Sequence, residues 1–261
     1  MTLPIEMPTV IFMVVIHVLA VAALAHVSLS GVIAFFILYW VTACLGVTLG
    51  YHRLLSHRSF KAPRWLTRFL ATCGALSAQM GPIDWAGVHR QHHKYADTDK
   101  DPHNSKKGFW WSHIGWIMCE KPARVVAERF TRDLNADPYL KWLNKWFLLL
   151  QAPVAAALFA VGGWATVLWG IFLRLAVVYH CTWLVNSATH YWGKKETDHS
   201  DDALNNRWVA AVTFGEGWHD NHHAYPNSAR QGFGDQIDIT WEHIKVLRKW
   251  GWITDVQVAP L

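Results

Sequence analysis

The chain has 261 residues, of which 52% are hydrophobic and 16% charged, and its formal net charge is +5. Length alone would allow one or two soluble domains. Long apolar runs argue against soluble domains. The distribution of Lys and Arg does not indicate nucleic-acid binding, because membrane orientation already explains it.

Four apolar segments predict membrane helices, at about 7–27, 31–50, 146–162 and 164–186. Each is close to the ~20 residues that a helix needs to cross a bilayer. The third is short enough to be buried instead, but its pairing with the fourth favours a hairpin. The first follows Glu6 rather than a basic stretch, so it is interpreted as a membrane helix and not as a signal peptide. Leu66–Met80 is shorter and is predicted to be interfacial or buried.

The charge distribution predicts the orientation. None of the 24 Lys and Arg residues precedes Tyr51, and the two hairpin connections carry none. The positive-inside rule therefore places residues 51–145 and 191–261 in the cytoplasm, together with both termini. We expect these two segments to form one cap, in a single domain of residues 1–261, and the positive charge to suit anionic membrane lipids.

The four cysteines are Cys44, Cys73, Cys119 and Cys181. They are far apart and form no Cys-x-x-Cys pair, and two of them lie in apolar segments. They are interpreted as small reduced core residues, neither a disulfide framework nor metal ligands.

Histidines form the strongest pattern in the chain. His89-Arg-Gln-His-His93 and His219-Asp-Asn-His-His223 repeat one spacing, in which residues i, i+3 and i+4 share a helix face. Imidazole suits iron, zinc, copper and nickel, but not calcium or magnesium. The pattern predicts a metal protein with more than one metal.

A third histidine pair precedes both triplets. His52 and His57 are five residues apart and would point about 140° from each other on a regular α-helix. Either the helix ends between them or they serve different metals. The polar loop 97–108 follows the first triplet. Its acids either orient ligating imidazoles or act as loop caps and turn residues, and the second interpretation is favoured for any single one.

These motifs resemble a known family. His52-Arg-Leu-Leu-Ser-His57 and the two triplets look like the three histidine boxes of the membrane fatty-acyl desaturases. The flanking text is similar to the Δ9 branch of that family, in Asp101-Pro-His-Asn-Ser-Lys-Lys-Gly108, Asn186-Ser-Ala-Thr-His190 and Gly215-Glu-Gly-Trp-His219. The resemblance spans roughly Gly46 to Asp255. It implies an all-α integral membrane protein with four transmembrane helices under a cytosolic helical cap that holds a di-iron centre.

The resemblance also implies a ligand set for two Fe²⁺ ions, which zinc could replace in a purified sample. The nine ligands it implies are His52, His57, His89, His92, His93, His190, His219, His222 and His223, with Asn186 reaching one metal through a water. His190 comes from the resemblance alone. The remaining histidines are assigned no role, namely His17, His26, His103, His113, His180, His199 and His243. His180 nevertheless lies inside a predicted span and needs a partner, and Arg174 in the same span is expected to face the bundle or to reach towards the cap.

The implied reaction is an O2-dependent insertion of a cis double bond at C9–C10 of a saturated acyl chain, with two electrons supplied from outside. A metal must activate the oxygen, because no side chain can oxidise an unactivated methylene. No catalytic residue beyond the metal ligands is predicted.

An acyl chain held against the metals calls for a narrow apolar tunnel. Tyr51, Trp85, Trp183 and Leu184 lie near the histidine motifs and are candidates to line it. Phe36 and Trp40 are hypothesised to form its floor, although aromatic residues in membrane helices more often face lipid or pack. Lys106 and Lys107 have three interpretations: they meet coenzyme A phosphates, anionic lipid head groups, or water alone.

The compact chain looks like the cyanobacterial type of the family. That likeness implies acyl groups on glycerolipid, ferredoxin as electron donor, and a thylakoid or plasma membrane location. Acyl-CoA and cytochrome b5 remain open. The alternatives are a related hydroxylase or ketolase with similar histidine motifs, and a membrane metal transporter. A transporter would place its ligands near mid-membrane, whereas these lie at the ends of apolar segments and in loops.

Overall fold

The computed structural model of the chain describes residues 4–119 and 128–260, which are helical and contain isolated β-bridges but no named strand. The prediction of an all-α fold is confirmed for these residues. The principal helices are α1 (Met7–Ala23), α2 (Leu29–Tyr39), η1 (Trp40–Ser56), α3 (Arg64–Ala75), α4 (Pro82–Tyr95), α7 (Pro138–Trp146), α8 (Gln151–Val167), η7 (Leu168–Leu173), α9 (Arg174–Asn186), α10 (Ala188–Tyr191), α11 (Arg207–Val212), α12 (His219–Ala224) and α13 (Ile239–Lys249). Short helical turns lie between them, η2 (Ser105–Lys107), η3 (Trp111–Gly115), α5 (Trp116–Met118), η4 (Glu128–Phe130), η5 (Leu134–Ala136) and η6 (Phe147–Leu150).

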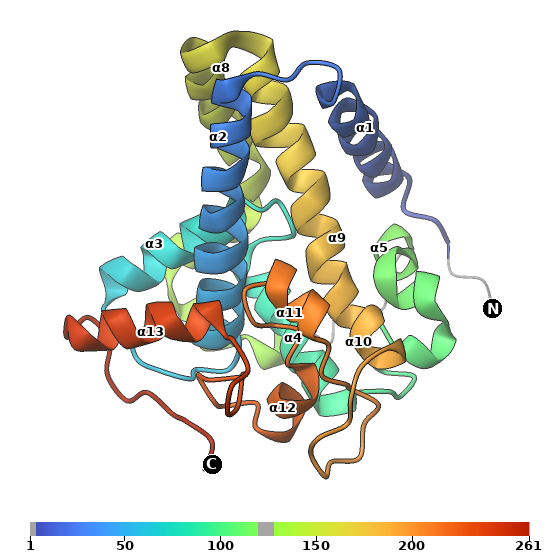
Figure 1. The fold of residues 1–261 in the computed structure, drawn as a ribbon, viewed down its shortest axis with the longest axis vertical. Coiled ribbons are helices and arrows are strands. Elements are labelled where there is room, and N and C mark those ends of the chain that lie inside the picture. The colour runs from blue at the N-terminus through green and yellow to red at the C-terminus, as the bar shows by residue number, and fades with distance from the viewer. Residues whose placement is uncertain (1–3, 120–127, 261) are drawn as a thin grey trace.

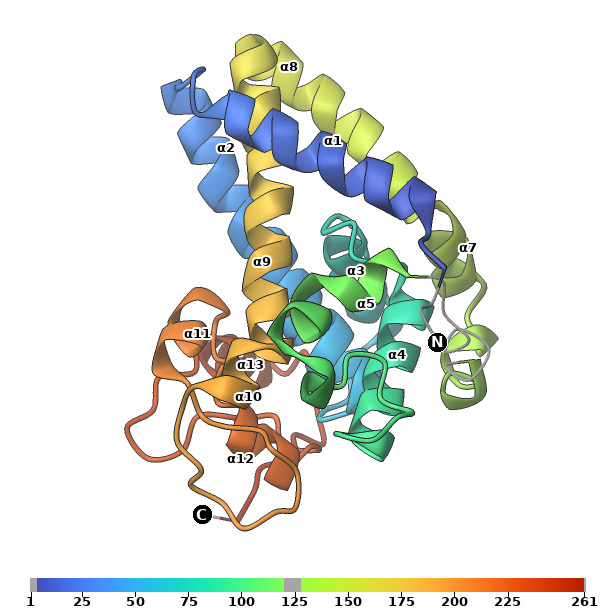
Figure 2. The same cartoon turned by 90° about the vertical axis from the view of Figure 1, so that its right-hand side faces the viewer.

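Two continuous helical segments are long and apolar enough to cross a bilayer, Leu29–Ser56 and Pro138–Tyr191, where four separate spans were predicted. α1, with 17 residues, is shorter. The longer segment bends at Gly162 and Gly163, whose backbone angles are not helical. The chain reverses there, so α8 and α9 run antiparallel in both views (Figures 1 and 2). This turn coincides with the connection predicted between 146–162 and 164–186.

The outer surfaces of the long helices are apolar. Val18 on α1, Ile33 on α2 and Phe159 on α8 are 61%, 50% and 49% exposed. A continuous apolar surface of this kind indicates contact with lipid rather than with water. The remaining helices gather at the opposite end of the molecule, where the cap lies below α2 and α9 (Figure 1).

η1 and α3 pack in direct backbone contact. A Cβ atom on Gly46 would lie 2.4 Å from the carbonyl carbon of Cys73, so only glycine fits there. Leu66 and Leu70 bury one face of α3, while Trp65 and Phe69 are more than half exposed on the other. One face of the segment predicted to be interfacial or buried is therefore in the core, and an interfacial position of its exposed face stays a prediction.

η1 is a π-helix, in which hydrogen bonds join residues five apart. The backbone N–H of His57 donates to the carbonyl oxygen of His52 at 3.1 Å. Because a π-helix takes more residues per turn than an α-helix, residue i+5 returns near the face of residue i. The two imidazole rings lie 4.8 Å apart. The helix ends at Ser56, between the two histidines, which was the first of the two predicted alternatives. Both histidines belong to one cluster.

Polar side chains within the long helices find partners inside the bundle. Arg174 is buried and donates to the carbonyl oxygen of Leu76 at 2.6 Å and to Gln151 Oε1 at 3.1 Å. His180 contacts His17 and His113, each at 3.0 Å between ring nitrogens. The predictions that Arg174 faces the bundle and that His180 needs a partner both agree with this packing. The four cysteines are free, as predicted.

Candidate metal centre

Three helical segments of the cap and the end of η1 bring the predicted histidines to one place. α4 begins at Pro82 and carries the first triplet in its last two turns. The second triplet forms most of the six-residue helix α12. His190 lies on α10, immediately after α9. All nine histidines implied by the resemblance lie together in the structure.

Five of them form one cluster, His52, His57, His89, His93 and His222, whose candidate ligand atoms all lie within 4.8 Å of one another. The Nε2 atom of His222 is 3.0 Å from that of His52 and 2.9 Å from that of His93. His57 and His89 approach within 2.7 Å through the same atoms.

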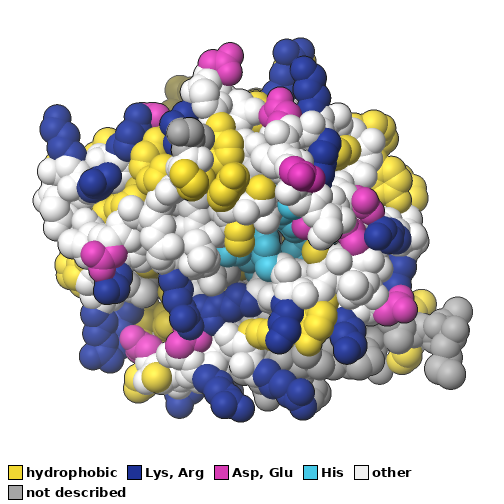
Figure 3. Space-filling view, turned by 90° about the horizontal axis from the view of Figure 1, so that it is seen from below, with side chains coloured by type: hydrophobic (Ala, Val, Ile, Leu, Met, Phe, Trp, Pro, Cys, Tyr) yellow, Lys and Arg dark blue, Asp and Glu magenta, His cyan; other side chains and the backbone are white. Residues whose placement is uncertain are grey.

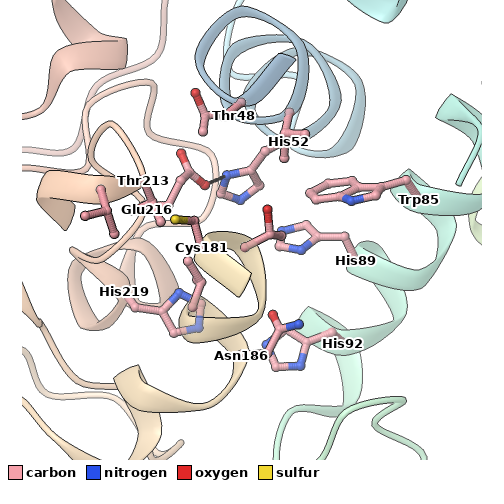
Figure 4. A pocket seen from close by; sticks show the side chains of 15 residues that line it. Thr48, His52, Trp85, His89, His92, Cys181, Asn186, Thr213, Glu216 and His219 are labelled. Carbon is pink, nitrogen blue, oxygen red and sulfur yellow. Dashed lines mark ion pairs between the residues drawn. The ribbon is translucent and has the colours of Figure 1, made fainter. Parts of the chain in front are cut away.

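The other four form a second cluster beside the first. The candidate ligand atoms of His92, His190 and His219 also lie within 4.8 Å of one another. His223 joins them, because its Nε2 is 3.3 Å from that of His92 and its ring centre is 4.3 Å from that of His219. Asn186 lies next to His92 and His219 in an adjoining pocket (Figure 4).

Carboxylates behind the imidazoles fix which ring nitrogen faces the clusters. Glu216 pairs with Nδ1 of His52, Asp101 lies 3.0 Å from Nδ1 of His92, and Asp201 lies 2.7 Å from Nδ1 of His223. A carboxylate at Nδ1 holds the proton there and leaves Nε2 free to bind a metal. Asp101 also accepts the backbone N–H groups of Asp97 and His103, so it is both an orienting acid and a loop cap.

Burial makes these imidazoles resist protonation. Desolvation, followed by the proximity of other imidazoles, lowers the pKa of His57, His89, His93, His219, His222 and His223. Burial acts in the same direction on His92, but the carboxylates of Asp101, Asp97 and Asp201 together outweigh it and raise the pKa of that ring. Neutral imidazole is the form that binds metals.

The donor set fits two transition-metal ions. With metal–nitrogen bonds of about 2.0–2.1 Å, neighbouring ligands at right angles are about 3 Å apart, close to the separations seen here. The Nε2 atom of His219 is buried and has no hydrogen-bond partner, as expected of a metal ligand. Nitrogen ligands with carboxylates one layer behind suit first-row transition metals rather than calcium or magnesium.

An apolar pocket opens onto both clusters. It holds about 50 Å³ of free volume between η1, α4, α9 and α11. Ala43, Val47 and Val185 supply apolar walls, while four cluster histidines form its polar end, namely His52, His89, His92 and His219. Figure 4 shows His89 and His92 on one side of the pocket and His219 across from them. Apolar walls that end in histidine rings suit an apolar group held against the metals.

The predicted substrate residues are spread more widely than this pocket. Trp85 lines it and stacks on His89, with ring centres 5.1 Å apart. Tyr51 is fully buried against Gly74, and Trp183 stacks on Tyr179. Leu184 is partly buried on α9 and is not among the residues that line the pocket.

Four further predicted residues lie outside the pocket. Phe36 and Trp40 are 63% and 40% exposed. Lys106 lies 3.4 Å from an oxygen of Asp202, and Lys107 lies over the ring of Trp111. The floor hypothesis and the head-group interpretations stay predictions.

Most residues that line the pocket were not predicted from the sequence as substrate residues, namely Ala43, Val47, Thr48, Cys181, Thr182, Val185, Val212, Thr213 and Glu216. Many of them lie within two or three turns of His52 or Asn186 on the same helices, a spacing that could have identified them. Tyr39 closes one side, because its hydroxyl donates to the carbonyl oxygen of Val212 and lies 3.3 Å from the sulfur of Cys181.

A metal centre built from histidine nitrogens, at the ends of long apolar helices and open to an apolar pocket, defines a membrane-associated metalloenzyme with an apolar substrate. A comparison with protein families agrees with this class. The model of the fatty acid desaturase family matches residues 28–235, and the chain belongs to that family.

Three cyanobacterial relatives cover nearly the whole chain. It is 47% identical over 252 residues to an sn-1 stearoyl-lipid 9-desaturase of Anabaena variabilis, covering 95% of this chain and 93% of the relative. It is 46% identical to an sn-1 stearoyl-lipid 9-desaturase of Synechocystis sp., covering 96% and 80%. It is 45% identical to an sn-2 palmitoyl-lipid 9-desaturase of a Nostoc species, covering 96% and 90%.

Proposed function

We propose that this protein is an O2-dependent acyl-lipid 9-desaturase, which inserts a cis double bond at C9–C10 of a saturated chain esterified to a glycerolipid. The observation that carries the proposal is the meeting of two histidine clusters at one end of an apolar pocket. The names of the cyanobacterial relatives support both the bond position and the lipid carrier.

The nine histidines would hold two iron ions, five on one and four on the other, with Asn186 reaching the second through a water. When bound, the irons supply the oxygen-activating chemistry that no side chain provides. Overall, one O2, two electrons and two protons are consumed as the acyl chain loses two hydrogens, and two waters form.

The chain's own residues act by positioning and exclusion. Glu216, Asp101 and Asp201 hold the Nδ1 protons of three ligands and so keep Nε2 directed at the metals. Ala43, Val47 and Val185 hold the acyl chain so that one carbon pair faces the clusters. The same apolar walls exclude water from the reacting carbons.

The proposed membrane arrangement has four crossings, by α1, by α2 with η1, by α8, and by η7 with α9. The apolar outer surface of these helices and the reversal at Gly162 and Gly163 support it. Because Lys and Arg are confined almost entirely to the cap segments, the cap and both termini would be cytoplasmic, at a thylakoid or plasma membrane. Ferredoxin is the proposed electron donor, with cytochrome b5 as the alternative.

The clusters lie at the cap end of the helices rather than in mid-membrane, which disfavours a transporter. No observation on the described residues favours a hydroxylase or ketolase.

The test is expression in a host that lacks 9-desaturase activity, with mass spectrometry of fatty acids separated by lipid class. We expect 9-monoenes to appear first on intact glycerolipid. Early appearance in the acyl-CoA pool would contradict the lipid carrier and leave the reaction in place. Hydroxylated chains from iron-loaded protein with a matched donor would overturn desaturation itself.

A further inference from the structure

A second cavity, lined by other residues than the apolar pocket, also reaches the histidine clusters. This basic cleft encloses about 730 Å³ of space open to solvent. His57, Arg58, Arg90, Phe130, Asn227 and Gln257 line it. It lies on the cap, so a soluble molecule can approach it without entering the membrane.

The two cavities touch different members of the same cluster. The apolar pocket meets His52 and His89, whereas the basic cleft meets His57. His57 is in turn only 2.7 Å from His89 through their Nε2 atoms. His57 thus both lines the cleft and belongs to the first cluster, while the acyl chain would occupy the other cavity.

The cleft is positively charged. Arg58 and Arg90 share a single carboxylate, that of Asp133, at 2.7 Å and 2.8 Å. Lys94 adds a third cation, 5.6 Å from the ring centre of Phe130. Figure 3 shows histidine side chains near the centre of the face seen from below, with Lys and Arg as well as Asp and Glu side chains around them. The two arginines that line the cleft and Lys94 beside it outnumber the one carboxylate that the arginines share. This charge favours an anionic partner, and its effect extends over about 10 Å at moderate salt.

We propose that the basic cleft is the docking site for an acidic one-electron carrier protein, and that electrons enter the metal centre at His57. This inference rests on the proposed function, which requires two external electrons. Arg58 is 65% exposed, and Asn227 and Gln257 are also exposed, so the cleft has an accessible rim for a protein surface. A complementary charge at such a rim mainly accelerates association with the partner.

Two variants test the charge of the cleft in different ways. Arg58→Gln removes an exposed cation, and Asn227→Glu adds an anion at an exposed position without breaking an ion pair. Lys245→Gln is the matched control, because Lys245 is likewise half-exposed and paired at 2.6 Å, with Glu242 on α13. Iron content is measured for each protein.

The assay compares two reductants on the purified, iron-loaded, full-length protein in lipid vesicles. Turnover is driven either by a reduced plant-type ferredoxin or by dithionite. The ratio of ferredoxin-driven to dithionite-driven product is expected to fall about tenfold in both cleft variants and to stay at the wild-type value in Lys245→Gln. Raising the salt concentration should reduce the wild-type ratio towards that of the variants.

Unchanged ratios in both cleft variants, with product formed under dithionite, would overturn the docking site alone and leave the cleft as a solvent channel. A wild-type protein that forms no unsaturated product with either reductant would overturn the proposed function, and the docking site with it.

Discussion

At the scale of single residues, the metal centre depends on which nitrogen of each imidazole is free. Glu216 shows how this is arranged. Its carboxylate pairs with Nδ1 of His52 and also lies 3.3 Å from the guanidinium of Arg53. Arg53 is itself fully buried and held by Asp238 at 2.9 Å. Glu216 is therefore held in place by the buried guanidinium of Arg53, and it in turn fixes the orientation of the His52 ring.

Glu216→Gln tests this arrangement. An amide keeps the size of the side chain but no longer holds the Nδ1 proton by charge. Loss of such an orienting acid typically reduces metal affinity or activity by about 10–100-fold. We expect a lower iron content by mass spectrometry and a matching loss of desaturation. Glu242→Gln, which alters an exposed acid on α13, should change neither; full iron loading of Glu216→Gln would contradict the role.

The depth of the apolar pocket gives a second prediction for single residues. Ala43 is buried and lines the pocket, so Ala43→Phe should shorten it. Each methylene excluded from such a pocket is worth about 1–3 kcal/mol. We expect products to shift towards acyl chains two carbons shorter, with a change in their ratio of at least about thirtyfold, measured by gas chromatography.

Trp40→Ala addresses the floor hypothesis directly. If Trp40 limits the chain length, the variant should accept longer chains. Trp40 donates its ring N–H to His243 at 3.1 Å and is partly exposed. Unchanged product lengths would reject the hypothesis and leave Trp40 as a packing residue between η1 and α13.

At the scale of elements, Asp133 links two segments of the cap beside the basic cleft. It follows η4 and receives Arg90 from α4 and Arg58 from the turn after η1. Burial alone would raise its pKa, but the hydrogen bonds from Arg90 and Arg58 lower it to about 2. The carboxylate thus stabilises the folded state at every pH above its unfolded pKa of about 3.9.

Asp133→Asn should therefore destabilise the protein at neutral pH. The pair is partly exposed, so solvent screening limits the loss to about 1 kcal/mol. Because the folded pKa is the lower one, the difference between wild type and variant should shrink as pH falls from about 4 to 2. Thermal unfolding in detergent measures it. Asp255→Asn, which breaks the exposed pair with Lys61, is the control and should have little effect.

At the scale of the whole molecule, the metal centre joins elements from across the chain. Its histidines come from the end of η1, from α4, from α10 and from α12. Metals bound to all four would tie the membrane helices to the cap and stabilise the native state by mass action. The buried imidazoles, which would repel one another if protonated, would instead share a bound metal ion.

Removal of metal should accordingly lower the thermal midpoint of the purified protein. Fe²⁺ or Zn²⁺ should restore it, whereas Mg²⁺ should not, because nitrogen ligands do not suit magnesium. Differential scanning fluorimetry or loss of helical circular dichroism measures the change. A midpoint that is insensitive to chelation, in protein shown to have lost its metal, would mean that the four elements hold together without it.

Much of the metal centre could be predicted, because its residues are close in sequence. An α-helix places His89, His92 and His93 on one face whatever surrounds it, so the spacing alone predicted both triplets. The shared position of His52 and His57 could not be predicted in this way, because the angle between them around the helix axis depends on whether the helix is an α-helix or a π-helix. His190 has no local pattern at all and was reached only through the family resemblance. Asp201 and Glu216 were missed because a contact between distant loops leaves no periodic signal.

By itself, the sequence determined the all-helical class, the apolar helices and the chemistry of the site. These follow from local properties: the hydropathy of consecutive residues, and the spacing of imidazoles along a helix. Only the tertiary structure decided that five histidines form one cluster and His92, His190 and His219 a second with His223 beside it, which acids lie behind them, and that Ala43, Val47 and Val185 line the pocket. Those outcomes depend on the packing of segments far apart in the chain, where backbone contacts such as that of Gly46 with Cys73 set the distances.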